Sequence, residues 1–450
     1  MREKGLQVKT ISRTAIAFVA LSMCYVISRA AGPEFSLQVL HEFEAGHPRG
    51  VIRGGDDAFY GVTMAGGVNG QGSVFRITSN GDLTSVFSFD GTNGRGPSSP
   101  LLQGRNGNFY GVTEFGNDEG TLFQITPTGQ LETLILFNGT NGYRPYGRLT
   151  EASDGNIYGT TIYSTIPYKA DGTVFQLTAT AELNTVFAFN AVNEGAQPLG
   201  WLTEGADGLL YGETSLDRQN IFKINSSGLL TPLVYLSGTN GSGFTYLIRS
   251  RDGNFYGTTG SGGAFGKGTF FKMSTEGVFT TLASFSSETG AFPNAIIEGS
   301  DRNFYGTTRY TTGVGAGLQG FGTVFRASPA GELATLAKFD GKNGREPLDD
   351  LAEGSDGNFY GTASSGGKND AGTFLRVVRT PRLSIAQSDL KVTLTWNSFI
   401  GALYRVEFKQ ALTDNTWISV ADALPANSGM TSFEVNRTGA TQGYYRIVLK

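Results

Sequence analysis

The ten residues GSDGNFYGTA, which span Gly354–Ala363, recur in related form along most of the chain. Four close copies and two weaker ones precede them: GRNGNFYGVT from Gly104, ASDGNIYGTT from Ala152, SRDGNFYGTT from Ser250, GSDRNFYGTT from Gly299, GGDDAFYGVT from Gly54 and GADGLLYGET from Gly205. The glycine after the tyrosine falls at positions 61, 111, 159, 212, 257, 306 and 361, so successive copies lie 45 to 55 residues apart. A period near 50 residues is typical of propellers and related arrays, in which each repeat forms one small sheet.

Each repeat contains four segments with the composition of β-strands, which we call A, B, C and D in chain order. In the third repeat they are residues 146–152, 156–161, 172–178 and 183–189. An Asp-Gly or Asn-Gly pair joins A to B, and such pairs favour a two-residue hairpin turn because they tolerate positive φ angles. We expect the tyrosine of the motif to pack between neighbouring sheets and its glycine to allow a close approach of the backbone.

The two ends of the array complement each other. The segment Leu37–Phe43 has the pattern of a D strand with no A, B or C before it, and Gly372–Val378 has that of a C strand with no D after it. Pairing the two would remove the exposed edges of an open array. The sequence therefore predicts an all-β fold in which residues 36–379 form a seven-bladed β-propeller of four-stranded blades, the last closed by the N-terminal strand.

Two further segments flank the array. Residues 1–30 combine a basic start, an apolar stretch of fourteen residues and small residues before Ala31. This is the pattern of a signal peptide, and the apolar stretch is short for a membrane span. We expect a protein that is secreted or lies in the cell envelope, periplasmic or extracellular, with no stable membrane span after removal of the signal. An uncleaved N-terminal anchor is the alternative. In residues 380–450, apolar side chains alternate in short runs around Trp396, which predicts a small β-sandwich.

Composition argues against several functions. Cys24 is the only cysteine and lies in the signal peptide, so the mature chain has neither disulfides nor thiolate ligands. Removing residues 1–30 takes five of the 35 basic and one of the 39 acidic residues, which leaves a net charge of −8 and disfavours nucleic acid as a partner. His41 and His47 have no histidine at metal-ligand spacing. Loops such as Asp90–Gly94 are rich in calcium-type ligands but lack the spacing of a calcium loop, so turn formation explains them better. We predict no catalytic residue, no metal and no cofactor.

The shared pattern of the repeats is GSDGNFYGTT, then VFRIT, then FDGTNG followed by proline. It resembles the GloVer tandem repeat of exported bacterial proteins, which are called choice-of-anchor proteins. The resemblance covers residues 36–379, about three quarters of the chain. It implies a propeller-like protein that is secreted or on the cell surface, and it brings no catalytic residues. Residues 380–450 resemble a fibronectin type III-like module, which implies a spacer or an attachment point.

The connections between strands differ in how much they vary. The B–C loops change strongly from repeat to repeat, whereas the A–B and C–D turns are uniformly tight. In a four-stranded blade the B–C and D–A loops emerge on the same face, so we expect a ligand to bind there. Arginine and aromatic side chains of these loops are the candidate ligand-binding residues: Arg95, Tyr143, Arg144, Arg345 and Tyr310.

Three functions stay open. The favoured one is a non-enzymatic binding protein that engages a glycan or another surface protein, because aromatic rings beside arginines suit sugars and acidic polymers. The alternative is an extracellular carbohydrate-active hydrolase or lyase, which needs carboxylates that converge on one face and have perturbed pKa values. The third is a structural component of a surface layer.

Overall fold

The computed structural model describes residues 35–116, 119–164, 171–190, 195–216, 218–311, 320–379, 383–387, 391–397, 403–411, 413–425, 430–436 and 444–449. The signal peptide predicted for residues 1–30 lies outside them. The described residues form β-strands and one short 3-10 helix, η1 (Gly238–Asn240), so the predicted all-β fold is confirmed. The chain divides into two compact units, one of Leu37–Val378 and one that contains Arg379–Lys450.

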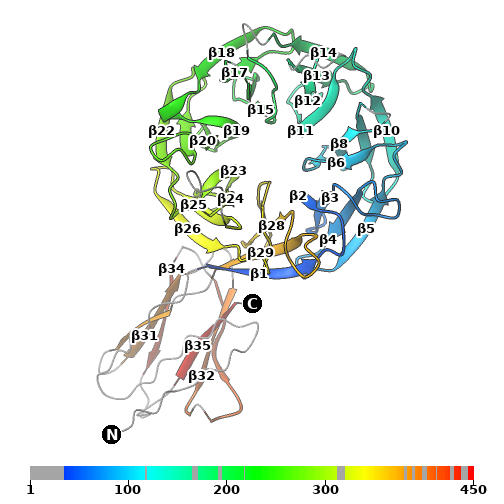
Figure 1. Cartoon of the computed structure of the whole chain (residues 1–450). Helices are drawn as coiled ribbons and strands as arrows, with labels where there is room; N and C mark the ends of the chain where they lie inside the picture. Colours follow the sequence, from blue (N-terminus) through cyan, green and yellow to red (C-terminus); the bar gives the residue numbers. More distant parts are fainter. Residues whose placement is uncertain are drawn as a thin grey trace. The chain divides into compact units, whose positions relative to one another are not determined.

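Strand pairing in the described part of the larger unit gives seven antiparallel sheets, which we number by repeat (Figure 1). Sheets 1 to 3 contain β2 (Pro48–Arg53), β3 (Phe59–Thr63), β4 (Ser73–Ile77) and β5 (Leu83–Ser88); β6 (Arg95–Pro97), β7 (Leu102–Gln103), β8 (Phe109–Phe115), β9 (Thr121–Ile125) and β10 (Leu131–Leu136); β11 (Tyr143–Glu151), β12 (Ile157–Tyr163), β13 (Thr173–Leu177) and β14 (Leu183–Ala188). Sheets 4 to 6 contain β15 (Thr203–Glu204), β16 (Leu210–Glu213), β17 (Asn220–Ile224) and β18 (Leu230–Tyr235); β19 (Ser242–Arg249), β20 (Phe255–Ser261), β21 (Thr269–Met273) and β22 (Phe279–Ser284); β23 (Ala291–Glu298), β24 (Phe304–Tyr310), β25 (Thr323–Ala327) and β26 (Leu333–Lys338). Sheet 7 contains β27 (Ala352–Glu353), β28 (Phe359–Ala363), β29 (Thr373–Arg379) and β1 (Phe35–Glu42).

The seven sheets stand around a common centre in Figure 1. The first strand of each repeat, such as β2, β11 or β23, lies on the inner side, and the fourth, such as β5 or β14, lies on the outer side. In sheets 1 to 6 the strands pair in chain order, so each of these repeats forms its own sheet, whereas sheet 7 combines β27, β28 and β29 with β1. Sheet 2 differs slightly, because its inner strand is split into β6 and β7, which both pair with β8.

The N-terminal strand β1 takes the outer place in sheet 7, beside β29. The backbone N–H of Phe43 donates to the Gly372 carbonyl at 3.0 Å, and the Arg376 guanidinium donates to the Gln38 side chain at 2.7 Å, across 338 positions of sequence. The chain end and the chain start of the repeat array are therefore hydrogen-bonded in one sheet.

The A–B turn of each repeat encloses three residues, so the predicted two-residue turn is wrong. In sheet 3, the Ala152 N–H donates to the Asn156 carbonyl at 2.9 Å and the Gly155 N–H donates to the Ala152 carbonyl at 3.0 Å. Gly155 has a φ of +82°, which is the glycine position of a three-residue hairpin loop. Asp154 acts through its carboxylate, which accepts the Asn156 N–H at 2.9 Å and the Tyr158 hydroxyl at 2.7 Å. The aspartate therefore ties the turn to the motif tyrosine.

The tyrosine of the motif packs between neighbouring sheets, as the sequence predicts. Tyr256 of sheet 5 stacks on Phe304 of sheet 6 with ring centroids 4.3 Å apart. The same stack joins other pairs of sheets: Tyr60 with Phe109, Tyr211 with Phe255, Tyr305 with Phe359, and Tyr360 with Phe59. The last of these joins sheet 7 to sheet 1. The two remaining motif tyrosines, Tyr110 and Tyr158, instead share core clusters with the aliphatic Ile157 and Leu210 of the next sheets.

The glycine that follows the tyrosine makes room for two kinds of neighbour. A Cβ on Gly159 would lie 2.4 Å from Cζ of Phe175, so this glycine admits an aromatic ring from strand C of its own sheet. A Cβ on Gly257 would lie 2.2 Å from the Tyr246 carbonyl oxygen, which is the close backbone approach that the sequence predicts. Any side chain here would force strands A and C apart.

A glutamate at the end of strand A fastens the turn of the preceding sheet. Glu204 of sheet 4 accepts the Ser153 backbone N–H of sheet 3 at 2.9 Å and also the Ser153 hydroxyl. Equivalent bonds join Glu151 to Arg105, Glu298 to Arg251 and Glu353 to Ser300. These bonds add polar contacts between repeats to the aromatic stacks.

The C-terminal unit contains two three-stranded antiparallel sheets in its described residues. One pairs β30 (Leu383–Gln387), β31 (Lys391–Asn397) and β34 (Met430–Asn436); the other pairs β33 (Ile418–Pro425), β32 (Leu403–Lys409) and β35 (Tyr444–Leu449). Trp396 is fully buried in the shared core and its ring lies 5.7 Å from that of Tyr404. The resemblance to a fibronectin type III-like module stays a prediction.

Candidate functional site

The B–C and D–A loops lie together at one end of the larger unit, which we call the mouth. Backbone bonds join them: the Arg144 N–H donates to the Glu119 carbonyl of the preceding repeat at 2.9 Å, and the Phe292 N–H donates to the Lys267 carbonyl at 3.1 Å. The connection between strands A and B always has five residues, whereas that between B and C ranges from five, 116–120, to twelve, 311–322. Variation in loop length is therefore confined to the side of the mouth.

Three of the five predicted site residues come together at the mouth. Arg95 of β6 and Arg144 of β11 both lie over the ring of Phe115, with guanidinium carbons 5.2 and 4.7 Å from its centroid. Arg144 is also 3.7 Å from a carboxylate oxygen of Glu114. Tyr143 is nearly buried, and its ring packs at 5.7 Å against that of Tyr163. Two cations thus flank one aromatic ring.

The other two predicted residues lie in different sheets. Arg345 of the seventh repeat forms an ion pair with Asp370 at 2.6 Å. Tyr310 ends β24, where its ring contacts Phe292 at 5.9 Å and the Arg309 guanidinium at 5.4 Å. These two residues belong to the mouth but not to the Arg95–Phe115–Arg144 group. Whether any of the five predicted residues binds a ligand stays a prediction.

A second polar group lies on the inner strands, and the sequence analysis missed it. Arg49 of β2 donates from Nε to Asp349 Oδ2 at 2.9 Å, and the Gly50 N–H donates to the same oxygen at 3.0 Å. Arg148 of β11 lies with Nη1 3.3 Å from Asp350 Oδ2. We name the following residues the inner-strand cluster: Arg49, Tyr146, Arg148, Trp201, Tyr246, Asp349 and Asp350.

Burial sets the charge states in this cluster. Asp349 and Asp350 are both less than 10% exposed. Burial alone would lower the pKa of Arg49, but the nearby Asp349 carboxylate outweighs it and raises that pKa. Burial raises the pKa of Tyr246, and the Asp349 carboxylate adds to the effect. Arg49 therefore stays a cation and Tyr246 stays a neutral hydroxyl group.

Asp350 is the titratable member of the cluster. Burial raises the pKa of its carboxyl group to about 6, although the Arg148 guanidinium acts in the opposite direction. Its Oδ1 atom is buried and has no hydrogen-bond partner among the residues the structure describes. The Arg148 guanidinium lies 5.9 Å from the ring of Trp201, whose indole N–H donates to the Leu247 carbonyl at 3.0 Å. A carboxyl group with these properties can exchange a proton near neutral pH.

The raised pKa of Asp350 predicts a pH dependence of stability. A carboxyl group whose pKa is near 6 when folded and 3.8 when unfolded takes up a proton on folding, so it stabilises the protein in acid. This stabilisation is lost as the pH rises through about 6, and two pKa units correspond to about 3 kcal/mol. Urea unfolding at pH 5 and pH 7.5 should show a larger gain in acid for the wild type than for Asp350→Asn. Equal pH dependence in both proteins would contradict the assignment.

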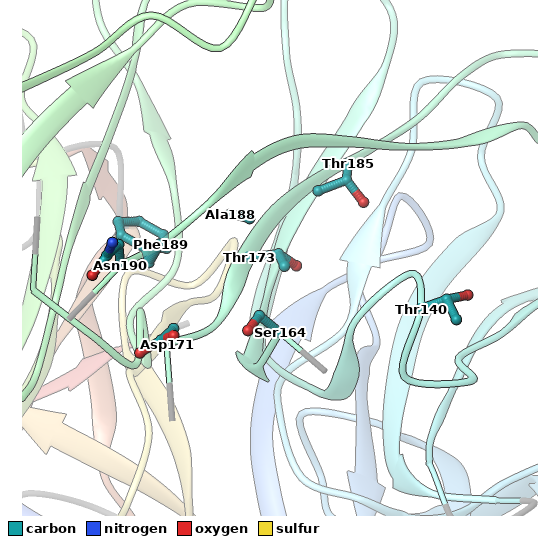
Figure 2. A pocket seen from close by; sticks show the side chains of 8 residues that line it. All are labelled: Thr140, Ser164, Asp171, Thr173, Thr185, Ala188, Phe189 and Asn190. Atoms are coloured by element: carbon teal, nitrogen blue, oxygen red, sulfur yellow. The ribbon is translucent and has the colours of Figure 1, made fainter. Parts of the chain in front are cut away.

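A small cavity of about 350 Å³ lies beside the mouth in the third repeat (Figure 2). Its lining is rich in hydroxyl groups: Thr140, Ser164, Asp171, Thr173, Thr185, Ala188, Phe189 and Asn190. None of the predicted site residues and none of the inner-strand cluster belongs to it. It shows that the loop face of at least one repeat is hollowed next to Asp171 and Asn190.

One feature of the sequence indicates the inner-strand cluster. Pro347–Leu351 reads PLDDL, which places two adjacent acids in an apolar stretch just before β27. Because polar groups buried among apolar residues are costly without partners, such a pair indicates a buried polar site. The partners of the two aspartates are Arg49 of repeat 1 and Arg148 of repeat 3. These arginines share no motif, so only the structure reveals the pairing.

No group of three or more His, Cys, Asp or Glu side chains among the described residues is placed to hold a metal ion. Within the same part of the chain, no helix has the length and apolar character needed to cross a membrane.

Repeated four-stranded antiparallel sheets with a polar inner side define a repeat protein of the all-β class. The chain belongs to the Gloeobacter/Verrucomicrobia repeat family, whose model matches residues 47–220 and 215–429. This confirms the family that the motif resembles. No curated protein sequence matches the chain.

Solved structures share the fold at low identity. A puromycin hydrolase has a TM-score of 0.50 and 10% identity, over 82% of this chain and 62% of that one, so the chain spans about three fifths of the hydrolase. A gluconolactonase from Xanthomonas campestris has a TM-score of 0.42 and 12% identity, over 66% and 95%. A luciferin-regenerating enzyme has a TM-score of 0.42 and 15% identity, over 68% and 99%. At these identities the likeness concerns the fold alone.

Proposed function

We propose that the larger unit is a closed seven-bladed β-propeller whose mouth binds a glycan or another protein of the cell envelope. Closure is supported by β1 beside β29 and by the stack of Phe59 on Tyr360, the same contact that joins other neighbouring sheets. It is also supported by the His47 N–H, which donates to the Ala371 carbonyl at 3.2 Å where the first and seventh repeats meet. In a closed propeller no sheet edge is left at this junction.

Export is the second part of the proposal. Residues 1–30 have the pattern of a signal peptide, and the remaining chain is acidic and free of cysteine. The protein then acts outside the inner membrane, with residues 380–450 as a spacer or attachment module. Nothing in this part of the proposal depends on the ligand.

The observation that carries the binding proposal is the pair of arginines on one half-buried ring. Arg95 and Arg144 approach Phe115 from two repeats, within the face where loop length varies. Variable loops on a uniform scaffold are typical of binding surfaces. An aromatic ring can stack on a sugar, and guanidinium groups can bind hydroxyl or carboxylate groups.

Asp350 favours a second candidate, a hydrolase. Its carboxyl group has a pKa of about 6, lies next to Asp349 and has one buried oxygen without a partner among the described residues. A general acid needs such a pKa. The two functions differ in one result: Asp350→Asn would abolish hydrolysis but leave binding at the mouth unchanged.

A glycan array probed with residues 31–450 tests the binding proposal. We expect binding to at least one glycan class, and we expect Arg95→Ala with Arg144→Ala to weaken it about tenfold, as for loss of two charge-assisted contacts. The control removes two arginines from A–B turns, Arg105→Ala with Arg251→Ala, and should leave binding unchanged. Failure to bind any glycan or envelope protein would reject the proposal, and equal weakening by the control pair would reject the mouth.

A further inference from the structure

One backbone position at the mouth has an unusual conformation in six repeats. It is the residue before a proline at or near the start of the inner strand, and its φ lies between +51° and +60°. We call these residues the pre-proline ring: His47, Gly96, Arg144, Gln197, Phe292 and Glu346. Only one of the six is a glycine. The fifth repeat has no proline here; its equivalent residue, Gly243, also has a positive φ, +75°, but donates its N–H to the Gln219 side chain and is not counted in the ring.

At the positive-φ positions of the turns, by contrast, most residues are glycine. In the A–B turns this position is glycine in five repeats and Asp57 or Arg302 in the other two. In the C–D turns it is glycine in five repeats and Ala181 in one. Glycine is favoured at such positions because a Cβ is sterically costly there. The pre-proline ring therefore keeps five side chains against a conformational cost that the turns mostly avoid.

The backbone at this position does not need a side chain. Each ring residue donates its N–H to a B–C loop carbonyl of the preceding repeat, at 2.9 to 3.3 Å. Gly96 makes the bond to Gln71 at 2.9 Å, as short as that of Arg144 to Glu119. The hydrogen bond and the following proline thus fix the conformation whichever residue is present. Backbone strain that is kept although the fold does not require it is characteristic of functional positions.

The side chains of the ring reach the ends of the B strands. Arg144 lies over Phe115, Phe292 packs on Tyr310, and a Glu346 oxygen lies 3.9 Å from the Arg309 guanidinium. His47 is exposed and its Nδ1 lies 2.9 Å from the Ser364 carbonyl oxygen. The ring residues are all at least partly exposed.

Four arginines lie at the mouth: Arg95, Arg144, Arg309 and Arg345. Arg345 is paired with Asp370 at 2.6 Å, whereas the acids near Arg144 and Arg309 are 3.7 and 3.9 Å away, longer than a direct hydrogen bond. Burial raises the pKa of Glu114, and the Arg144 guanidinium acts in the opposite direction. Guanidinium groups beside Phe115, Phe292 and Tyr310 suit a ligand that carries both carboxylates and sugar rings.

We propose that the pre-proline ring determines ligand specificity and that the ligand is a polysaccharide with carboxylate groups, such as a chain of uronic acids. This rests on the proposed binding function of the mouth. The ring contributes side chains of five different types at equivalent positions. These side chains can contact different parts of one ligand that lies across several repeats.

Replacement by glycine separates this role from a structural one. The test protein carries Arg144→Gly and Phe292→Gly, and the matched control carries Asp57→Gly and Arg302→Gly. Both sets relieve a positive φ, so the melting temperature should be unchanged or about 1 °C higher in each. Affinity for polygalacturonate, measured by titration calorimetry, should fall at least tenfold for the ring protein and not at all for the control.

Each other result has a definite meaning. Unchanged affinity of the ring protein, or a lower melting temperature than the control, would overturn the role of the ring. Wild-type protein that binds neutral dextran as tightly as polygalacturonate, or binds neutral glycans only, would overturn the acidic ligand while the proposed function stands. Wild-type protein that binds no member of the glycan panel would overturn the acidic ligand, and failure to bind an envelope protein as well would overturn the proposed function. Added salt should weaken binding to polygalacturonate.

Discussion

Deletion of residues 35–43 is expected to lower the free energy of unfolding of the larger unit by about 5 kcal/mol, or to prevent folding altogether. The deletion removes β1 and Phe43, which is 3% exposed, and with them Leu40, which packs on the core between sheets 7 and 1. Burial of a large apolar side chain contributes about 1.5–3 kcal/mol. The loss also exposes the hydrogen-bonding edge of β29. Urea unfolding followed by tryptophan fluorescence measures the effect.

A milder change to the same strand serves as the control. Gln38→Ala with Glu42→Ala removes the side-chain bonds to Arg376 and to the Lys368 N–H but keeps the backbone pairing. We expect a loss of only about 1–2 kcal/mol, since each hydrogen bond contributes about 1 kcal/mol. A deletion protein that unfolds at the same urea concentration as the wild type would show that β1 does not complete the seventh sheet.

Arg49→Met is expected to destabilise the protein by about 3–5 kcal/mol, because it leaves the buried Asp349 carboxylate without its cation. The change keeps most of the side-chain volume. A double variant, Arg49→Met with Asp349→Leu, should recover much of the loss, since it removes the unpaired charge as well. Unfolding curves of the two single and the double variants give the coupling between the residues.

An exposed pair in the same unit provides the comparison. Arg53 and Asp57 are 38% and 60% exposed, and Arg53→Met should cost less than about 1 kcal/mol because solvent screens such pairs. A loss of similar size for Arg49→Met and Arg53→Met would mean that the inner-strand cluster is solvated, and it would remove the physical basis for the pKa assigned to Asp350.

The fold could be predicted from the sequence because it repeats. The motif recurs with its turn, its tyrosine and its glycine, so an error in one repeat is corrected by the others. The details of the turn were wrong because Asp-Gly pairs occur in both two-residue and three-residue hairpins, and the sequence does not show which carbonyl Gly155 faces. The bonds from Glu204 to Ser153 join different repeats, so no reading of a single repeat reveals them.

The candidate site was harder to predict for the opposite reason. A repeat pattern identifies the residues that recur in every repeat. The residues of the inner-strand cluster differ from repeat to repeat, so the pattern does not identify them. Arg49 and Asp349 are 300 positions apart and meet only because the first and seventh sheets are neighbours. The mouth could be located from loop variation, but the positive φ of residues such as Phe292 depends on backbone bonds to another repeat.

Hydrogen–deuterium exchange of residues 31–450, with and without a glycan that binds, tests most directly whether the mouth is the binding face. Exchange reports local protection of backbone amides. We predict slower exchange in the B–C and D–A connections, including 116–120, 142–145 and 290–293, and no change in the A–B turns at 152–156 and 250–254. Protection in the A–B turns, or in the C-terminal unit alone, would contradict binding at the mouth.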